Sequence, residues 1–172
     1  MTSPIAALLG RATVALTLAS AHHKARRRHH ASAAPLSLRA QGAAALLATA
    51  PSAALVTHAA QQPGMRWQPP PSPTAQALLV AHVLSSAVIE EVLWRGVLAR
   101  RHPRGLAIAS VLGFVAAHVP RDGRRSAPIH AVNATAWAMS ASRGRRLRWP
   151  VLAHTGYNLA AHTLVVADGA SK

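Results

Sequence analysis

The chain has 172 residues, 51% of them hydrophobic, and its 19 Lys and Arg residues outnumber four acidic residues to give a formal net charge of +15. The length favours one domain, and the absence of cysteine excludes disulfides and thiolate metal sites. Most basic residues fall between apolar blocks or at the carboxyl-terminal tail, whereas a nucleic-acid-binding protein more often places Lys and Arg along one helix face. The pattern predicts a multi-pass membrane protein with no nucleic-acid partner.

Six apolar blocks follow one another along the chain, and each is expected to form a membrane helix. They are Pro4–Ser20, Leu38–Ala60, Thr74–Ala99, Gly105–Val119, Pro128–Ser142 and Trp149–Ala167. A spanning helix needs about 20 apolar residues. The third and sixth blocks reach this length, the fourth and fifth need flanking residues, and Pro51 interrupts the second. We predict an all-α transmembrane helix bundle with about six spans, although roughly four to seven remain compatible with the pattern.

The front of the chain is interpreted as a pair of anchor helices and a connector. The first block lacks Lys and Arg on its amino-terminal side and is followed by Lys24 and further basic residues, which is the reverse of signal-peptide polarity. The Pro-rich segment Gln61–Pro73 is expected to be extended. We therefore divide the single membrane domain into residues 1–73, the anchor helices and connector, and residues 74–167, a helical core that carries the candidate site.

The third block contains Glu90, Glu91 and Arg95 in otherwise apolar surroundings. A charge at the centre of a membrane helix costs about 2.5–3.5 kcal/mol on insertion scales, so these residues mark a candidate functional site. Glu91 and Arg95 are one helical turn apart, in the favoured order of acid before base. Glu90 lies about 100° further round the helix and is left as a candidate general base. A purely structural Glu–Arg–Glu cluster is the alternative for this segment.

The later blocks supply histidines and an amide. His118 lies in the fourth block, and His154, Asn158 and His162 follow at four-residue spacing in the sixth, on one helix face. Side-chain donors of this kind can stabilise a developing oxyanion. A lone histidine on an apolar face is more often a hydrogen-bonded core residue. Three further residues have no assigned role: His82, His130 and Asn133. Of these, His82 lies on the same helix face as Ser86 and Glu90.

Together these segments resemble the motifs of a known family. Glu90-Glu91-x-x-Trp94-Arg95-Gly96, Phe114-x-x-x-His118 and His154-x-x-x-Asn158 are similar, in order, to the three motifs of the CPBP family. That family includes the CAAX prenyl proteases of the Rce1 type (CAAX prenyl protease 2) and their Abi-family bacterial relatives. The resemblance covers about Thr74 to Val166. It implies an all-helical intramembrane protease of the glutamic type.

The resemblance also implies catalytic roles. Glu90 would activate the hydrolytic water, His118 would help to place that water, and His154 and Asn158 would line the oxyanion site. No cofactor and no metal are implied. The substrate would be a membrane-associated protein or peptide, cut near its carboxyl-terminal end in the bilayer of the cell membrane. The Ala- and Arg-rich composition favours a bacterial source.

Supporting roles follow from the same resemblance. Glu91 and Arg95 would hold the first motif in shape, and Phe114 would pack beside the site without reacting. Two other functions stay open. One is a metal-dependent membrane hydrolase with Glu90, His118 and His154 as ligands, a donor set that suits zinc although the chain has no H-E-x-x-H helix. The other is a non-catalytic membrane immunity or scaffold protein. The sequence does not predict the oligomeric state.

Overall fold

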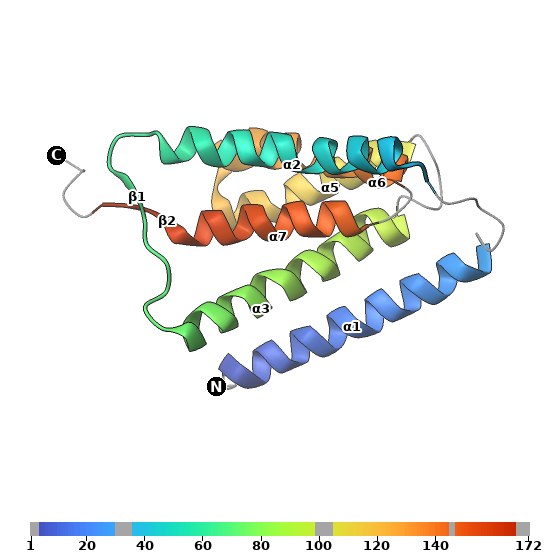
Figure 1. Cartoon of the computed structure of the whole chain (residues 1–172), viewed down its shortest axis with the longest axis horizontal. Coiled ribbons are helices and arrows are strands. Elements are labelled where there is room, and N and C mark those ends of the chain that lie inside the picture. Colours follow the sequence, from blue (N-terminus) through green and yellow to red (C-terminus); the bar gives the residue numbers. More distant parts are fainter. Residues whose placement is uncertain (1–3, 30–35, 99–104, 145–146, 168–172) are drawn as a thin grey trace.

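The fold is a bundle of helices with one small two-stranded sheet (Figure 1), seen in a computed structural model that describes residues 4–29, 36–98, 105–144 and 147–167. The helical elements are α1 (Pro4–His29), α2 (Leu38–Ala60), α3 (Pro73–Glu91), the π-helix η1 (Val92–Leu98), α5 (Gly105–Asp122), the 3₁₀ turn η2 (Arg124–Ser126), α6 (Ala127–Gly144) and α7 (Arg148–Thr163). The strands are β1 (Met65–Trp67) and β2 (Leu164–Val166). The predicted all-α class is confirmed.

Local sequence fixes where two of the long helices begin. The hydroxyl oxygens of Ser37 and Ser72 each accept a hydrogen bond from a backbone N–H three residues later, at 3.2 Å in both cases. Pro73, at the first position of α3, lacks the N–H that a helix start would leave unpaired. These caps set the register of α3 and therefore the face on which its polar side chains lie.

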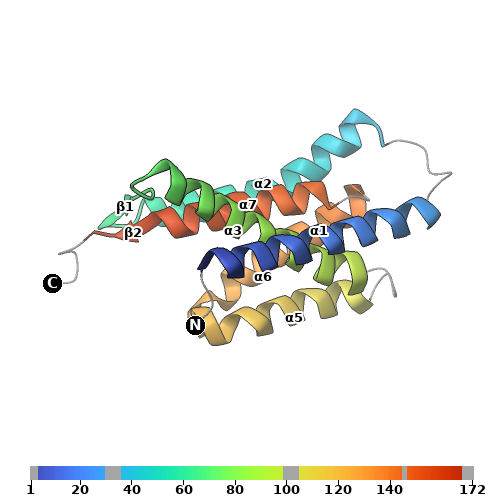
Figure 2. The ribbon, with the colours of Figure 1, turned by 90° about the horizontal axis from the view of Figure 1, so that it is seen from below.

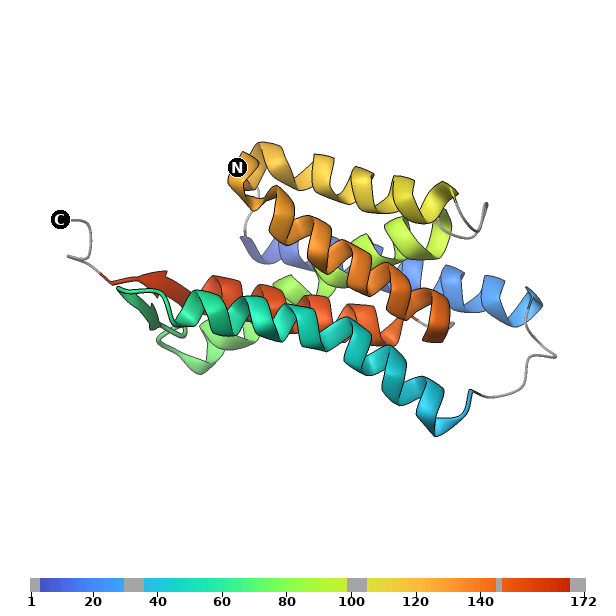
Figure 3. The same cartoon turned by 90° about the horizontal axis from the view of Figure 1, so that it is seen from above.

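Helix α3 lies between α1 on one side and α7 on the other, and α3 and α7 run in opposite directions (Figures 1 and 2). Helix α2 packs along α6 and α7, and α5 packs against α6, as the view from above shows (Figure 3). The buried cluster at the centre combines large rings with small side chains: Phe114, Trp137, Ala48, Ala134, Ala136 and Ala153. Alanine at these positions lets the helices approach closely, as in membrane bundles.

The prediction of about six membrane spans is not confirmed. Within the described residues, two segments are long and apolar enough to cross a membrane, Leu38–Ala60 and Pro73–Gly96. The apolar stretch of α1 covers only Ala6–Ala21. Helices α5, α6 and α7 have 18, 18 and 16 residues, or about 24–27 Å at 1.5 Å per residue, against a hydrocarbon thickness of about 30 Å.

The surface of the bundle nevertheless suits a bilayer. Only 17% and 28% of the two candidate spans are buried inside the protein, so neither is the enclosed core helix of a soluble fold. Large apolar side chains face outward from several helices, among them Leu46, Leu84, Ile108, Leu112 and Leu152. An apolar exterior of this kind is expected where lipid is the solvent.

The sixth apolar block differs from its prediction. The block Trp149–Ala167 was expected to be one spanning helix, but α7 ends at Thr163 and the β-branched run that follows forms β2. This strand pairs antiparallel with β1, with Arg66 opposite Val165. Strand β1 lies in the Pro-rich connector, which was predicted to be extended. Pro51 lies inside a continuous α2, so the predicted interruption of the second block is wrong.

Helix α3 changes directly into a π-helix after Glu91, where the sequence predicted a regular α-helix. The π-helix η1 carries Trp94 and Arg95 and packs against α5. The contact needs a glycine, because a Cβ atom on Gly113 would lie 2.5 Å from Cζ3 of Trp94. Short π-helical segments occur often at functional sites.

Replacing Gly113 with alanine is therefore expected to push Trp94 away and to lower the free energy of unfolding by about 1–3 kcal/mol. Thermal unfolding of the purified protein in detergent micelles measures the effect. The control is Gly42→Ala, because a Cβ atom at Gly42 has no neighbouring atom within 4 Å. Equal stability of the two variants would contradict the close contact.

Candidate active site

A cavity of about 410 Å³ opens among α1, α3, α5, α6 and α7. At one end it is lined by residues from three helices, which are Glu90 of α3, His118 of α5 and His154 of α7. Asn158, one turn further along α7, also lines it and is half-buried. The four residues that the sequence predicted to be catalytic therefore border one space.

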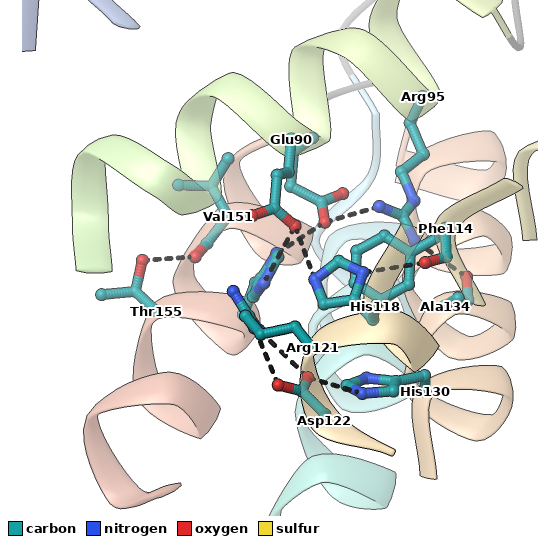
Figure 4. Close-up of polar contacts among 12 residues, drawn as sticks. Glu90, Arg95, Phe114, His118, Arg121, Asp122, His130, Ala134, Val151 and Thr155 are labelled. Atoms are coloured by element: carbon teal, nitrogen blue, oxygen red, sulfur yellow. Dashed lines mark hydrogen bonds and ion pairs between the residues drawn. The ribbon is translucent and has the colours of Figure 1, made fainter. Parts of the chain in front are cut away.

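Two histidines lie beside the Glu90 carboxylate, and Figure 4 shows its contact with His118. Its Oε2 atom lies 3.3 Å from Nε2 of His118 and 3.8 Å from Nε2 of His154. The Glu90 side chain keeps 24% of its surface exposed, whereas the neighbouring Glu91 side chain is fully buried. Only the first carboxylate of the pair can reach a molecule in the cavity.

The contacts of the two His118 ring nitrogens indicate where the protons of the Glu90–His118 pair lie. Nδ1 of His118 lies 2.8 Å from the carbonyl oxygen of Phe114, which can only accept, so Nδ1 carries a proton. Nε2 then faces the Glu90 carboxylate, and two bare acceptors would repel one another. A proton is therefore shared between Glu90 and His118, a pair suited to taking up and releasing protons.

Glu91, unlike Glu90, is fully buried, and it links the first predicted motif to the third. Nη1 of Arg95 donates to Oε1 of Glu91 at 2.7 Å, which confirms the pair predicted from the helical spacing. The same oxygen lies 3.0 Å from Nδ1 of His154, and Nη2 of Arg95 donates to the carbonyl oxygen of Ala134. Because Glu91 accepts from both partners, it fixes Nδ1 of His154 as a donor and turns Nε2 toward Glu90. The link from Glu91 to His154 was not predicted.

Aromatic rings pack against the two histidines of the site. Phe114 stacks on the His118 ring at a centroid distance of 4.1 Å, and Trp137 stacks on His154 at 4.2 Å. The Arg95 guanidinium lies 4.9 Å from the centre of the Phe114 ring. Phe114 thus packs beside the site, in the position expected of it. Stacked rings leave few rotamers open to the histidines and so hold them in place.

A second polar cluster, centred on Asp122, lies beside the one formed by Glu90, His118 and His154. Sequence reasoning missed Asp122. Asp122, the last residue of α5, accepts two hydrogen bonds from Arg121 and lies 3.0 Å from Nε2 of His130 (Figure 4). The hydrogen bonds from Arg121 hold the pKa of Asp122 below its ordinary value. The His130 ring is 4.8 Å from that of His118. The sequence offered one signal for Asp122: it is one of only four acidic residues in the chain.

The remaining candidates all line the cavity, and one of them also joins two helices. His82 and His162 line the cavity at a distance along α3 and α7 from Glu90 and His154, together with Arg11 of α1. Asn133 is buried, and its Oδ1 accepts a hydrogen bond from the Ser52 hydroxyl at 2.9 Å. That bond ties α6 to α2, which gives Asn133 a structural contact.

The described residues contain no group of three or more His, Cys, Asp or Glu side chains arranged to hold a metal ion. The ligand set considered from the sequence, Glu90 with His118 and His154, thus gains no support from the arrangement of donor atoms.

Comparison with known protein families gives a match over the second half of the chain. The family described as Rce1-like, type II CAAX prenyl endopeptidase Rce1-like, matches residues 72–160, slightly more than half of the chain. The matched span contains Glu90, His118, His154 and Asn158 and leaves out α1 and α2. No curated protein and no solved structure matches the chain.

Proposed function

Because this chain belongs to the Rce1-like family of type II CAAX prenyl endopeptidases, a family of membrane-embedded proteases, we propose that it is an intramembrane endopeptidase of the glutamic type. It hydrolyses a peptide bond near the carboxyl-terminal end of a membrane-associated protein or peptide. The observation that carries this proposal is the convergence of Glu90, His118 and His154 at one end of the cavity.

The chemistry begins with a water molecule in the cavity that is hydrogen-bonded to Glu90 and is placed with the help of His118. Glu90 takes a proton from this water as the oxygen attacks the scissile carbonyl carbon. The carbonyl oxygen becomes an oxyanion, which is stabilised by the side chains of His154 and Asn158. Glu90 then gives its proton to the leaving nitrogen as the C–N bond breaks. The products are a new carboxyl terminus and a released amine, and Glu90 returns to its starting state.

The buried groups prepare this site without touching the substrate. Glu91 holds His154 with Nε2 directed at the cavity, and Arg95 neutralises Glu91. Removing either partner would leave a charge buried without compensation. Glu91 and Arg95 therefore support catalysis by fixing the position of His154 and the ring nitrogen that faces Glu91.

The proposal extends to the organisation of the chain and its location. Residues 1–73 act as anchor helices and connector, and residues 74–167 form the catalytic core of one membrane domain. The protein resides in the cytoplasmic membrane of a bacterial cell, with lipid around the apolar exterior of the bundle. Its partner is the membrane-associated substrate.

The experiment compares membrane fractions from cells that express the wild-type chain or Glu90→Gln. Carboxyl-terminal peptides are identified by mass spectrometry. We expect a set of shortened carboxyl termini that requires Glu90, with the matching uncut proteins accumulating in the variant. Arg39→Gln, an exposed change outside the cavity, serves as the control and should give the wild-type set. Identical termini in wild-type and Glu90→Gln membranes would overturn the proposal.

A further inference from the structure

Asn133 of α6 is a buried cavity residue that the catalytic proposal does not use. Its side chain is 1% exposed, and it lines the cavity together with Glu90, His154 and Asn158. Its Nδ2 atom has no hydrogen-bond partner among the residues that the structure describes. An unpaired buried donor destabilises a fold, so native proteins keep few of them. A donor that borders a cavity can find its acceptor in the molecule that the cavity binds.

The hydrogen bonds around Ser52 of α2 fix the orientation of the Asn133 amide. The indole N–H of Trp137 can only donate, and it donates to Oγ of Ser52 at 3.3 Å. The single hydroxyl proton of Ser52 then has two acceptors within reach, Oδ1 of Asn133 at 2.9 Å and the carbonyl oxygen of Ala48 at 3.4 Å. The shorter contact takes the proton, so Oδ1 is turned toward α2 and Nδ2 is left for the cavity.

The neighbours of Asn133 along α6 place it close to the catalytic groups. His130, Asn133 and Trp137 follow one another at spacings of three and four residues and therefore share a helix face. The His130 ring lies 4.8 Å from that of His118. The Trp137 ring stacks on that of His154 at 4.2 Å. Along the helix, Asn133 thus lies between the residues that contact the two catalytic histidines.

A role in joining helices does not account for the amide. Ser140, two turns further along α6, also ties α6 to α2, because its hydroxyl donates to the carbonyl oxygen of Ala44. One such bond uses the only donor of a serine, whereas the amide of Asn133 brings in a donor that the contact with Ser52 does not use. That second donor is a feature that a purely structural residue does not need.

Peptide carbonyl oxygens are the acceptors that the proposed substrate would carry into the cavity. Asn133 on α6 and Asn158 on α7 present side-chain amides to the same space. We propose, on the basis of the proposed function, that Asn133 is a substrate-binding residue whose Nδ2 donates a hydrogen bond to a backbone carbonyl oxygen beside the scissile bond. Because this contact is made to the main chain, it holds the peptide whatever its side chains are.

Binding can be followed at the amide itself, since Asn133 and Asn158 are the only asparagines in the sequence. Glu90→Gln protein labelled with ¹⁵N at asparagine is studied by NMR in micelles, and Asn158→Ala identifies which side-chain NH₂ signal belongs to which residue. The probe is a tetra-alanine amide with an amino-terminal lauroyl chain, which has no terminal carboxylate. We expect the NH₂ protons of Asn133 to shift downfield on binding and to exchange more slowly with water. Lauramide, the anchor without a peptide, should leave them in place.

Two variants of the same labelled protein separate ligand binding from helix packing. Asn133→Leu roughly keeps the volume and removes the donor, and the Asn158 signal then reports binding. We expect the Kd of the probe to rise about fivefold, the effect of one hydrogen bond between neutral groups. Ser140→Ala breaks a contact between the same two helices outside the cavity, so it should keep the Kd of the parent protein.

Three results would overturn this assignment. One is an Asn133 signal that stays in place while the Asn158 signal moves, which is also what a permanently bound water at Nδ2 would give. Another is the same Kd in the parent protein and in Asn133→Leu. The third is that the probe does not bind. Because cleavage is not read, a shift of the Asn133 signal would establish a peptide site even if no carboxyl terminus in the membrane fractions depended on Glu90.

Discussion

Glu90→Gln protein is expected to fold, enter the membrane and bind substrate, yet to cleave it about 10²–10⁴-fold more slowly than the wild type. The amide keeps the size of the carboxylate but cannot take the proton of the attacking water. Of the adjacent carboxylates Glu90 and Glu91, Glu90 is the one with exposed surface at the cavity, at 24% of its side chain. Cleavage is measured with purified protein in micelles and a saturating concentration of a substrate peptide identified in the comparison of membrane fractions, so that kcat is compared.

The comparison that isolates this effect is the pair Glu90→Gln and Glu91→Gln. Glu91 is fully buried and bonded to Arg95 and His154, so its amide variant should lose stability together with activity. Glu90→Gln should lose activity while its melting temperature changes little. If a folded Glu90→Gln protein turned over substrate at the wild-type rate, Glu90 would not be the general base.

Arg95→Leu is expected to lower the free energy of unfolding by about 3–5 kcal/mol, the cost of leaving a buried charge without its partner. The Arg95 and Glu91 side chains are 1% and 0% exposed, so water cannot take the place of the guanidinium. The hydrogen bond to the Ala134 carbonyl, which ties η1 to α6, is lost as well. Unfolding is followed by denaturant titration in micelles.

A double variant tests the reason for that loss. Glu91→Leu combined with Arg95→Leu removes both charges, and it should be more stable than Arg95→Leu alone because no isolated carboxylate remains. Arg39→Leu, an exposed change of the same kind, should cost little. If Arg95→Leu proved as stable as Arg39→Leu, the buried pair would have no structural role.

The parts of the site that the sequence predicted are those governed by spacing within one helix. Glu91 and Arg95 are one turn apart, and the bond between them follows from the helical period. His154, Asn158 and His162 repeat every four residues, and all three line the cavity. Local periodicity of this kind is independent of how the helices pack, so it could be derived before the fold was known.

The contacts between helices could not be derived in the same way. The bond from Glu91 to His154 joins residues 63 positions apart, and that from Arg11 to His82 joins residues 71 apart. Both depend on which helices are neighbours and how they are rotated. The π-helix after Glu91 and the pairing of β1 with β2 are likewise consequences of packing. The six predicted spans are not confirmed, because polar residues shorten the apolar part of several of the described helices.

The central claim, that Glu90 delivers a solvent water to the peptide bond, is tested most directly by isotope labelling. Wild-type protein is mixed, in excess over a substrate peptide identified in the comparison of membrane fractions, in water enriched in ¹⁸O, and the first turnover is analysed by mass spectrometry. One ¹⁸O atom is predicted in each newly formed carboxyl terminus, and in the same time Glu90→Gln is predicted to form about 10²–10⁴-fold less product. A first-turnover product that contains only ¹⁶O would show that the oxygen came from the enzyme and would contradict the mechanism.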